Sequence, residues 1–450
     1  MKRKAALHNL GCKVNSYELE SMQQMLEKAG YEIVPFEPGA DLYLINTCTV
    51  TNIADRKSRQ MLHKAKKMNP DALVVATGCY AQAKGKELEK DEAIDLVIGN
   101  NKKQELISLL ESEWEQRRTT APEETVPSCL RESVIDISKT REYEELQIDR
   151  TEEHTRAFIK VQDGCNQFCT YCIIPFARGR VRSRRKEDVI SEVQRLADSG
   201  CKEIVLTGIH LSSYGVDLSE EENLLSLIRA VHQVEGIRRI RLGSLEPGII
   251  TEEFVTALTE LPKVCHHFHL SLQSGCDRTL KAMNRRYTSG EYRERCQILR
   301  KHLKDPALTT DVITGFPGET EEDFAASAAF VDETDFFETH IFPYSRREGT
   351  KAAAMPDQLP EAVKKQRLHV LEELDRRKRV QYLQRAVGTA GEVLFEEQVS
   401  REGVLYWSGY TMEYRRVFLR SEEDLENEIR EVHFTGLLGG EGLIGEIRLS

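Results

Sequence analysis

Short apolar runs alternate with amphipathic stretches over residues 4–110. The stretches YELESMQQMLEKAG and NIADRKSRQMLHKAKKM repeat apolar positions with the period of a helix, and Gly30 ends the first. The runs between them have the length and composition of buried strands: AALHNL, LYLINT and LVVATG. This order predicts an α/β domain with a doubly wound parallel sheet.

The same alternation returns between residues 157 and 345. Stretches such as EDVISEVQRLADSG and NLLSLIRAVHQVEG have helical period. The candidate strands are AFIKVQ, EIVLTG, RIRLGS, HFHLSLQ, LTTDVITGF and FETHIFPY. Six strand–helix units in succession predict a partial barrel of parallel strands, with its chemistry at their carboxyl ends.

The rest of the chain differs in pattern. A charged, irregular linker with one candidate strand, SVIDI, precedes the partial barrel. A long charged helix from Glu361 follows it, and the strands and glycine turns of residues 388–450 predict a small antiparallel barrel. The predicted limits are 1–114 for the N-terminal domain, 115–150 for the linker, 151–383 for the core and 384–450 for the small barrel.

Composition indicates where in the cell the protein is found. No apolar run approaches the roughly 20 residues that a membrane span needs, and MKRKAALHNLGC lacks the apolar stretch of a signal peptide. We therefore expect a cytoplasmic protein without a membrane partner, whose 11 cysteines stay reduced. The net charge of −11 argues against general affinity for nucleic acid, so any such contact has to be local.

Three cysteines crowd the segment DGCNQFCTYCIIP: Cys165, Cys169 and Cys172. They follow the first strand of the predicted partial barrel. Thiolates are soft donors that suit an iron–sulfur cluster, and three ligands to four irons leave one iron open for chemistry. A zinc site with a distant fourth ligand and three unrelated buried thiols are the alternatives.

This Cys-x3-Cys-x2-Cys loop after the first strand of a partial barrel resembles the radical S-adenosylmethionine (SAM) enzymes. The resemblance implies that the open iron of a 4Fe-4S cluster binds the amino and carboxylate groups of SAM. It also implies that an electron from the cluster cleaves SAM to methionine and a deoxyadenosyl radical. Tyr171 would lie near the adenine of SAM, although a packing tyrosine fits the position equally.

Three further cysteines each follow a predicted strand, in HNLGC, INTC and ATGC. Because the carboxyl ends of parallel strands share one edge of a sheet, Cys12, Cys48 and Cys79 can converge on a second 4Fe-4S cluster. For any one of them alone, a buried structural thiol is the alternative.

Together these features resemble the methylthiotransferases, whose members join a cluster-bearing N-terminal domain, a radical SAM core and a C-terminal RNA-binding TRAM barrel. LGCKVNSYE, residues 10–18, is most similar to the branch that acts on threonylcarbamoyladenosine in tRNA. The resemblance implies methylthiolation at carbon 2 of that base, at position 37 in the anticodon loop. One SAM would supply the methyl group and a second the radical, and a flavodoxin or ferredoxin the electron.

Other functions stay open. The competing substrates are isopentenyladenosine in tRNA and an aspartate of a ribosomal protein. A non-catalytic iron–sulfur RNA-binding sensor is the competitor from another class, although a structural cluster is better served by four ligands.

Weaker candidates complete the site. Strand ends in VLTGIH, GSLEP and SLQSG would contact SAM or substrate through Gly208, Ser244, Glu246 and Gln273, with a plain strand-end glycine as the alternative for Gly208. RGRVRSRRK, residues 178–186, would bind RNA phosphates, unless it is a solvated charged face. Its basic residues are Arg178, Arg180, Arg182, Arg184, Arg185 and Lys186.

In the acidic small barrel only SGYTMEYRRVF mixes aromatic and basic residues. It would stack on RNA bases through Tyr410, Tyr414, Arg415 and Arg416. His267 and His269 share a strand face and are read as hydrogen-bonded histidines rather than metal ligands. The remaining cysteines are expected to be structural: Cys129, Cys201, Cys265, Cys276 and Cys296.

Overall fold

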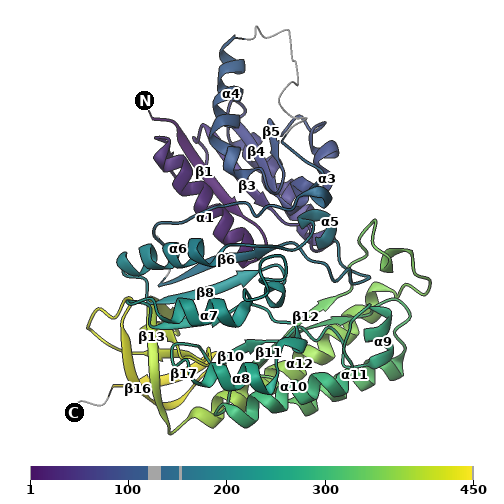
Figure 1. The fold of residues 1–450 in the computed structure, drawn as a ribbon, viewed down its shortest axis with the longest axis vertical. Coiled ribbons are helices and arrows are strands. Elements are labelled where there is room, and N and C mark those ends of the chain that lie inside the picture. Colours follow the sequence, from purple (N-terminus) through teal and green to yellow (C-terminus); the bar gives the residue numbers. More distant parts are fainter. Residues whose placement is uncertain (1, 120–132, 152–154, 448–450) are drawn as a thin grey trace.

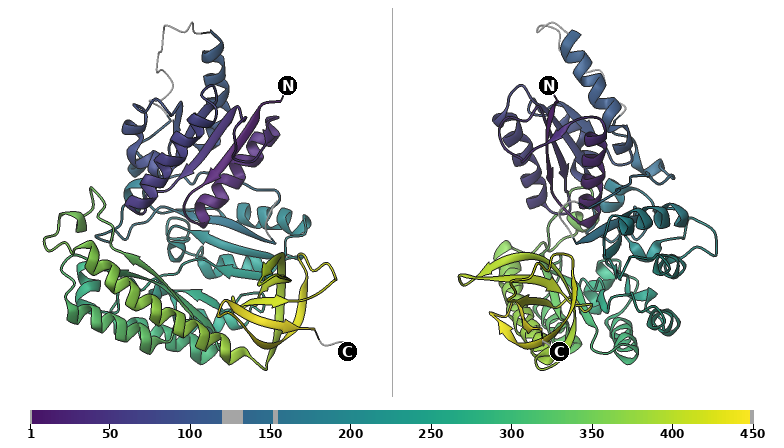
Figure 2. Two further views of the ribbon diagram at one scale, coloured as in Figure 1. Left: turned by 180° about the vertical axis from the view of Figure 1, so that it is seen from behind. Right: turned by 90° about the vertical axis from the view of Figure 1, so that its left-hand side faces the viewer.

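The computed structural model describes residues 2–119, 133–151 and 155–447, and they form three units. An N-terminal α/β domain stands above a central half-barrel, and a small closed barrel lies beside that half-barrel (Figure 1). The same arrangement is seen from behind and from the side in Figure 2. Within the described ranges, no helix combines the length and apolar character needed to cross a membrane.

The N-terminal domain is a five-stranded parallel sheet in the order β2-β1-β3-β4-β5. Leu42 and Leu44 of β3 join the core on one face, whereas Tyr43 and Ile45 join the core on the other. Burial on both faces confirms the doubly wound arrangement. Its elements are β1 (Lys4–Asn9), α1 (Lys13–Lys28), β2 (Glu32–Ile33), β3 (Leu42–Thr47), α2 (Asn52–Met68), β4 (Leu73–Gly78), α3 (Cys79–Leu88), β5 (Leu96–Ile98) and α4 (Leu106–Thr119).

The linker differs from its prediction in two ways. Helix α4 continues to Thr119, past the predicted limit at residue 114. The predicted strand SVIDI is wrong, because Asp136 accepts a hydrogen bond from the backbone N–H of Ser138 and starts a short 3-10 turn, Ile137–Lys139. Instead of pairing as a strand, the segment is held through Ser133, whose carbonyl accepts from the N–H of Gly99 at 2.7 Å.

The central unit contains the six predicted parallel strands, in the order β6, β8, β9, β10, β11 and β12. Single bridges, such as Ile240 to Val264, join β9 to β10 and close the two part-sheets into a half-barrel. The strands are β6 (Arg156–Asp163), β7 (Arg182–Ser183), β8 (Glu203–Gly208), β9 (Arg239–Leu242), β10 (His267–His269), β11 (Ala307–Thr314) and β12 (Glu338–Pro343). The helices are α5 (Ile174–Arg178), α6 (Lys186–Asp198), α7 (Leu224–His232), α8 (Glu252–Thr259), α9 (Asp277–Ala282), α10 (Ser289–His302), α11 (Glu321–Thr334) and α12 (Glu361–Ala386).

Side chains alternate along β6 between two environments. Ala157, Ile159 and Val161 pack in the apolar core that also holds Val193 of α6. Because successive side chains point to opposite faces of a strand, Arg156, Phe158 and Lys160 occupy the other, concave face. We call this concave surface the inner face of the half-barrel.

The C-terminal unit is a closed barrel in the order β13-β14-β15-β17-β16. It is antiparallel as predicted except for β15 and β17, which pair in parallel because the intervening β16 crosses to β13. It meets the amino ends of the half-barrel strands, where Arg239 donates to the carbonyl of Tyr410 at 2.7 Å. Its strands are β13 (Ala390–Arg401), β14 (Val404–Tyr410), β15 (Arg416–Leu419), β16 (Ile429–Leu438) and β17 (Gly442–Glu446).

Candidate metal centres

The structure brings Cys12, Cys48 and Cys79 to one edge of the N-terminal sheet. Cys48 and Cys79 directly follow β3 and β4, whose last residues, Thr47 and Gly78, are paired in register. Cys12 caps α1 just after β1, the other neighbour of β3. The three thiols are electrostatic neighbours of one another. Parallel strand ends therefore gather residues more than thirty positions apart.

Two glycines allow the loops that carry these cysteines to approach one another. Gly11 has φ +121°, and a Cβ there would lie 2.9 Å from Nδ2 of Asn15 and 3.2 Å from Cβ of Cys48. Gly78 has φ +93°, and its Cβ would meet Oδ1 of Asn46 at 2.3 Å. Residues with side chains would be strained at both positions and would force the loops apart.

The other three predicted cluster ligands, Cys165, Cys169 and Cys172, occupy the loop between β6 and α5. We call them the second trio, and Cys12, Cys48 and Cys79 the first trio. Gly164, with φ +71°, starts the loop, because any Cβ there would lie 1.8 Å from the carbonyl of Arg180. The N–H of Cys165 donates to the carbonyl of Gly179 at 3.0 Å, and that of Cys172 to the carbonyl of Cys169 at 3.0 Å. Short backbone bonds thus fold the loop so that its thiols are neighbours.

All six thiols are free, which is the state that metal binding requires. Burial raises the pKa of Cys48 to about 12 and that of Cys172 to about 12, so binding iron must displace protons from them. No three or more His, Cys, Asp or Glu side chains in the described ranges are set to hold a single metal ion. A four-iron cluster takes each ligand on a different iron, so its thiols need not converge on one point.

Each trio also receives a hydrogen bond from an arginine. Nε of Arg178 donates to Sγ of Cys79 at 3.1 Å, and Nη1 of Arg285 donates to Sγ of Cys169 at 3.4 Å. Hydrogen bonds to ligand sulfur are among the features that tune iron–sulfur clusters, so the donor sets fit two such clusters.

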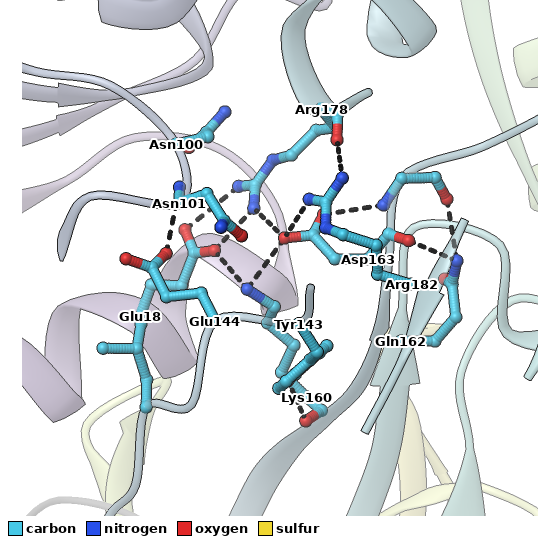
Figure 3. A network of polar contacts seen from close by, with 12 residues as sticks. Glu18, Asn100, Asn101, Tyr143, Glu144, Lys160, Gln162, Asp163, Arg178 and Arg182 are labelled. Atoms are coloured by element: carbon cyan, nitrogen blue, oxygen red, sulfur yellow. Dashed lines mark hydrogen bonds and ion pairs between the residues drawn. The ribbon is translucent and has the colours of Figure 1, made fainter. Parts of the chain in front are cut away.

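Arg178 also lies in a buried polar network with Glu18, Lys160 and Asp163 (Figure 3). Its Nη1 donates to Glu18 of α1 at 2.5 Å and to Asp163, at the end of β6, at 3.3 Å. Lys160 bonds Glu18 at 2.9 Å and Asp163 at 2.8 Å, and Lys103 lies 3.3 Å from Glu18. Asp163 is two residues before Cys165, so one ionic network fixes the N-terminal domain on the cluster loop of the half-barrel.

This network corrects the prediction for the basic segment at residues 178–186. Arg178, Arg182 and Arg184 are fully buried, with Arg184 paired to Glu192, so none of the three can reach RNA. The structure leaves Arg180 and Arg185 exposed. Short turns and strand β7 point alternate arginines inward, a direction that composition does not reveal.

Of the predicted SAM contacts, Glu246 lies beside Cys165. Glu246 accepts from Arg285 at 3.0 Å and lies 3.2 Å from Nε2 of His210. Gln273 has φ +72° and pairs its backbone with β11. Ser244 is exposed after β9.

Two other predicted SAM contacts are crowded by the protein itself. A Cβ on Gly208 would lie 2.9 Å from Cβ of Gln162, whose side chain closes over it. Tyr171 packs against a small core that includes Phe316 and Tyr344.

Of the predicted RNA-stacking residues of the small barrel, Tyr410, Tyr414 and Arg415 lie instead at its contact with the half-barrel. The rings of Tyr410 and Tyr414 stack at 4.7 Å, and the Tyr414 hydroxyl accepts from Arg156 at 3.0 Å. Arg415 is buried and pairs with Asp305 at 2.5 Å. Arg416 bonds Oγ of Ser408 at 2.9 Å. The prediction is wrong for Tyr414 and Arg415, because protein groups already occupy them.

The remaining residues agree with a structural reading. His269 bonds Thr309 at 3.1 Å and Asp311 at 3.2 Å, and His267 lies 3.3 Å from Thr309. The sequence did not reveal the carboxylate beside His269. Cys201, Cys265 and Cys296 are buried and Cys276 is half-buried, whereas Cys129 lies outside the described residues.

Sequence reasoning missed Arg285 and the partners of Arg178. Arg285 comes from the chain after α9, in NRRY, which carries no recognisable spacing relative to Cys169. Glu18 falls on a turn of α1 that reads as an ordinary polar helix face.

Comparisons with known proteins agree with this arrangement. Residues 4–99 match the family described as uncharacterized protein family UPF0004, and residues 159–331 match the radical SAM superfamily. The radical SAM methyltransferase TsrM from Kitasatospora setae has the same fold over much of its length. Its TM-score is 0.57 at 18% identity, over 78% of this chain and 74% of that one.

Whole-chain relatives are closer in sequence. Threonylcarbamoyladenosine tRNA methylthiotransferase MtaB of Bacillus subtilis is 42% identical over 95% of this chain and 92% of its own. Its Aquifex aeolicus counterpart is 42% identical over 88% and 93%. The tRNA-2-methylthio-N(6)-dimethylallyladenosine synthase of Moorella thermoacetica is 37% identical over 94% of each chain. The chain belongs to the radical SAM methylthiotransferase family.

Proposed function

We propose that this protein attaches a methylthio group to carbon 2 of N6-threonylcarbamoyladenosine at position 37 of tRNA. Two of its relatives at 42% identity carry that activity in their names. The observation that supports the proposal most directly is the pairing of two three-thiol sites through Arg178. Two sites joined by one buried network suit a reaction that needs both a radical and a sulfur donor.

Each set of three cysteines has its own role in this proposal. When bound, two 4Fe-4S clusters and SAM supply the radical and sulfur chemistry that side chains cannot. Cys165, Cys169 and Cys172 hold the SAM-binding cluster, and Arg285 and Glu246 order the rim of that site. Cys12, Cys48 and Cys79 hold the second cluster, on which the sulfur is carried.

The other groups have supporting roles in this proposal. Ser244 and Gln273 contact SAM, whereas Gly208 makes room for the Gln162 side chain and Tyr171 packs against the small core of Phe316 and Tyr344. Exposed Arg180, whose guanidinium lies 4.7 Å from the ring centroid of Phe168, contacts the tRNA beside the cluster loop. The closed barrel, residues 390–446, is a TRAM domain. Within the described residues, the N-terminal domain spans 2–119, the linker 133–151 and the radical SAM core 155–386. A flavodoxin or ferredoxin delivers the electron, and the reaction takes place in the cytoplasm.

Dimethylallyladenosine in tRNA is the second candidate substrate, because a relative with that activity in its name is 37% identical. Mass spectrometry of tRNA nucleosides separates the two. Cells lacking the gene should lose 2-methylthio-threonylcarbamoyladenosine and accumulate its precursor, and the purified iron-loaded protein should restore it in vitro. Loss of the dimethylallyl product instead would reassign the substrate, and unchanged nucleosides would refute both.

A further inference from the structure

The segment that follows β12, residues 344–354, contacts the loops of both trios, and we call it the connecting segment. The N–H of Ala352 donates to the carbonyl of Thr170, inside the loop of the second trio, at 2.8 Å. On the N-terminal domain, the N–H of Asn52, the first residue of α2, donates to Oγ of Ser345 at 3.0 Å. The connecting segment rises from the half-barrel towards the N-terminal domain (Figure 1). One stretch of chain therefore joins the loop of the second trio to the start of α2.

Arg347 of the connecting segment is buried against the loop that carries Cys48. Its Nη2 donates to Oγ1 of Thr49 at 2.8 Å and to Oδ2 of Asp55 at 2.7 Å. Its Nη1 donates to Oδ1 of Asn52 at 2.5 Å. Thr49 directly follows Cys48, and its hydroxyl also donates to Asp55 at 2.7 Å. A single guanidinium thus holds the whole turn between Cys48 and α2.

Cys48 moves with this turn rather than independently of it. Oγ of Ser58, on α2, accepts from the N–H of Cys48 at 3.3 Å and donates to its carbonyl at 3.1 Å. Arg178, after β6, holds Cys79 in a similar way. The first trio is therefore held to the half-barrel at two points, one after its first strand and one after its last.

We propose that Arg347 is a positioning residue, which holds the Cys48 loop at a fixed place relative to the second trio so that the sulfur donor and the radical source reach the same substrate carbon. This deepens the proposed function and rests on it. The fork of a guanidinium fixes direction as well as distance. Because a displacement of about 1 Å can slow a reaction about 100-fold, transfer between the two sites should depend on Arg347.

The test uses the full-length iron-loaded protein as wild type, Arg347→Gln and Arg347→Lys. Arg347→Gln should keep about eight irons and wild-type formation of deoxyadenosine, because the second trio alone supplies the radical. The amount of methylthiolated tRNA per deoxyadenosine should fall about 10- to 100-fold. The magnetic interaction between the two reduced clusters, measured by electron paramagnetic resonance, should weaken or spread. Arg347→Lys can still pair with Asp55, so it should restore part of both quantities.

The matched control is Glu348→Gln, at the next residue of the connecting segment. Glu348 pairs with Lys84 of α3 at 3.1 Å across the same boundary, but its side chain is 88% exposed. An exposed ion pair contributes little, so this variant should match wild type in every measurement.

Two results would overturn the inference. In the first, iron, deoxyadenosine and product fall in parallel in both Arg347 variants, because Arg347 would then serve only the fold. In the second, the product ratio and the magnetic interaction stay at their wild-type values. If wild type makes no methylthiolated tRNA, the proposed function fails instead. The magnetic measurement needs no tRNA and would still decide whether Arg347 positions the two sites.

Discussion

Nε of Arg178 donates a hydrogen bond to Sγ of Cys79 at 3.1 Å, across the boundary between the half-barrel and the N-terminal domain. The other N–H groups of the guanidinium bond Glu18, Asp163 and Asn15. All five donors of a guanidinium are therefore used inside the protein. A residue predicted to bind tRNA phosphates instead fastens the two cysteine sites together.

Replacing Arg178 should weaken this junction strongly. Arg178→Met leaves two buried carboxylates with one cation fewer, which costs about 3–5 kcal/mol of unfolding free energy. The measurement is urea unfolding of the iron-loaded protein. Arg185→Met, an exposed residue of the same segment, is the matched control and should be within about 0.5 kcal/mol of wild type. Similar stabilities for both variants would show that the network contributes little.

The second trio should hold half of the iron. Anaerobically reconstituted protein is expected to contain about eight irons, in two four-iron clusters. Replacing Cys165, Cys169 and Cys172 by alanine should leave about four irons and abolish reductive cleavage of SAM, because the SAM-binding iron is lost. Cys276→Ala, at a half-buried cysteine outside both trios, should change neither quantity. SAM cleavage that persists in the triple variant would contradict the assignment.

The N-terminal trio should separate radical formation from sulfur transfer. Alanine at Cys12, Cys48 and Cys79 should spare cleavage of SAM to deoxyadenosine but stop methylthiolation, because these thiols hold the sulfur-bearing cluster. Both products are measured by liquid chromatography with mass spectrometry in one reaction. Full methylthiolation by this variant would make the N-terminal site merely structural.

Periodicity predicted the elements well, because buried strands and amphipathic helices carry their pattern locally. β3, β4 and α2 have the predicted limits, and the edge that collects Cys12, Cys48 and Cys79 follows from parallel strand order. In irregular segments, the direction of a side chain depends on partners that are distant in the sequence. Arg178 finds Glu18 160 positions away, and nothing near either residue in the sequence indicates the contact.

Stability at low pH should depend on Glu203, which lies under Arg156, Arg239 and Arg241. Although burial alone would raise its pKa, Arg241 and then Arg156 lower it to about 2. A carboxylate with a lowered pKa stabilises the fold above its unfolded value of about 4.3, and this contribution disappears as the pH falls towards 2. We expect a loss of about 3 kcal/mol over that range.

The measurement compares unfolding free energies at pH 5 and pH 2.5 for wild type and Glu203→Gln. The variant should start less stable at pH 5 and lose less on acidification, because its side chain does not titrate. Glu220→Gln, at an exposed carboxylate, should follow wild type. Parallel pH curves for Glu203→Gln and wild type would remove Glu203 from the acid response.

The tRNA-binding contribution of the small barrel can now be separated from that of the cluster loop. Arg415 is buried against Asp305 and Tyr382, so Arg415→Ala should lower stability without changing the salt dependence of tRNA binding. Arg180 is exposed, with its guanidinium 4.7 Å from the ring centroid of Phe168 in the cluster loop, and Arg185 is exposed further along the same segment. For each arginine that neutralises a phosphate, its replacement should reduce the slope of log affinity against log salt by roughly 0.7–0.9.

Affinity is measured at several salt concentrations for wild type, Arg180→Gln with Arg185→Gln, and Arg415→Ala. If both exposed arginines touch phosphates, the double variant flattens the slope by about 1.4–1.8, and Arg415→Ala matches wild type. Phe176, with 54% of its surface exposed next to Phe168, would add base stacking at the same place. A flattened slope in Arg415→Ala alone would instead return RNA recognition to the barrel, and would require Arg415 to leave Asp305 when tRNA binds.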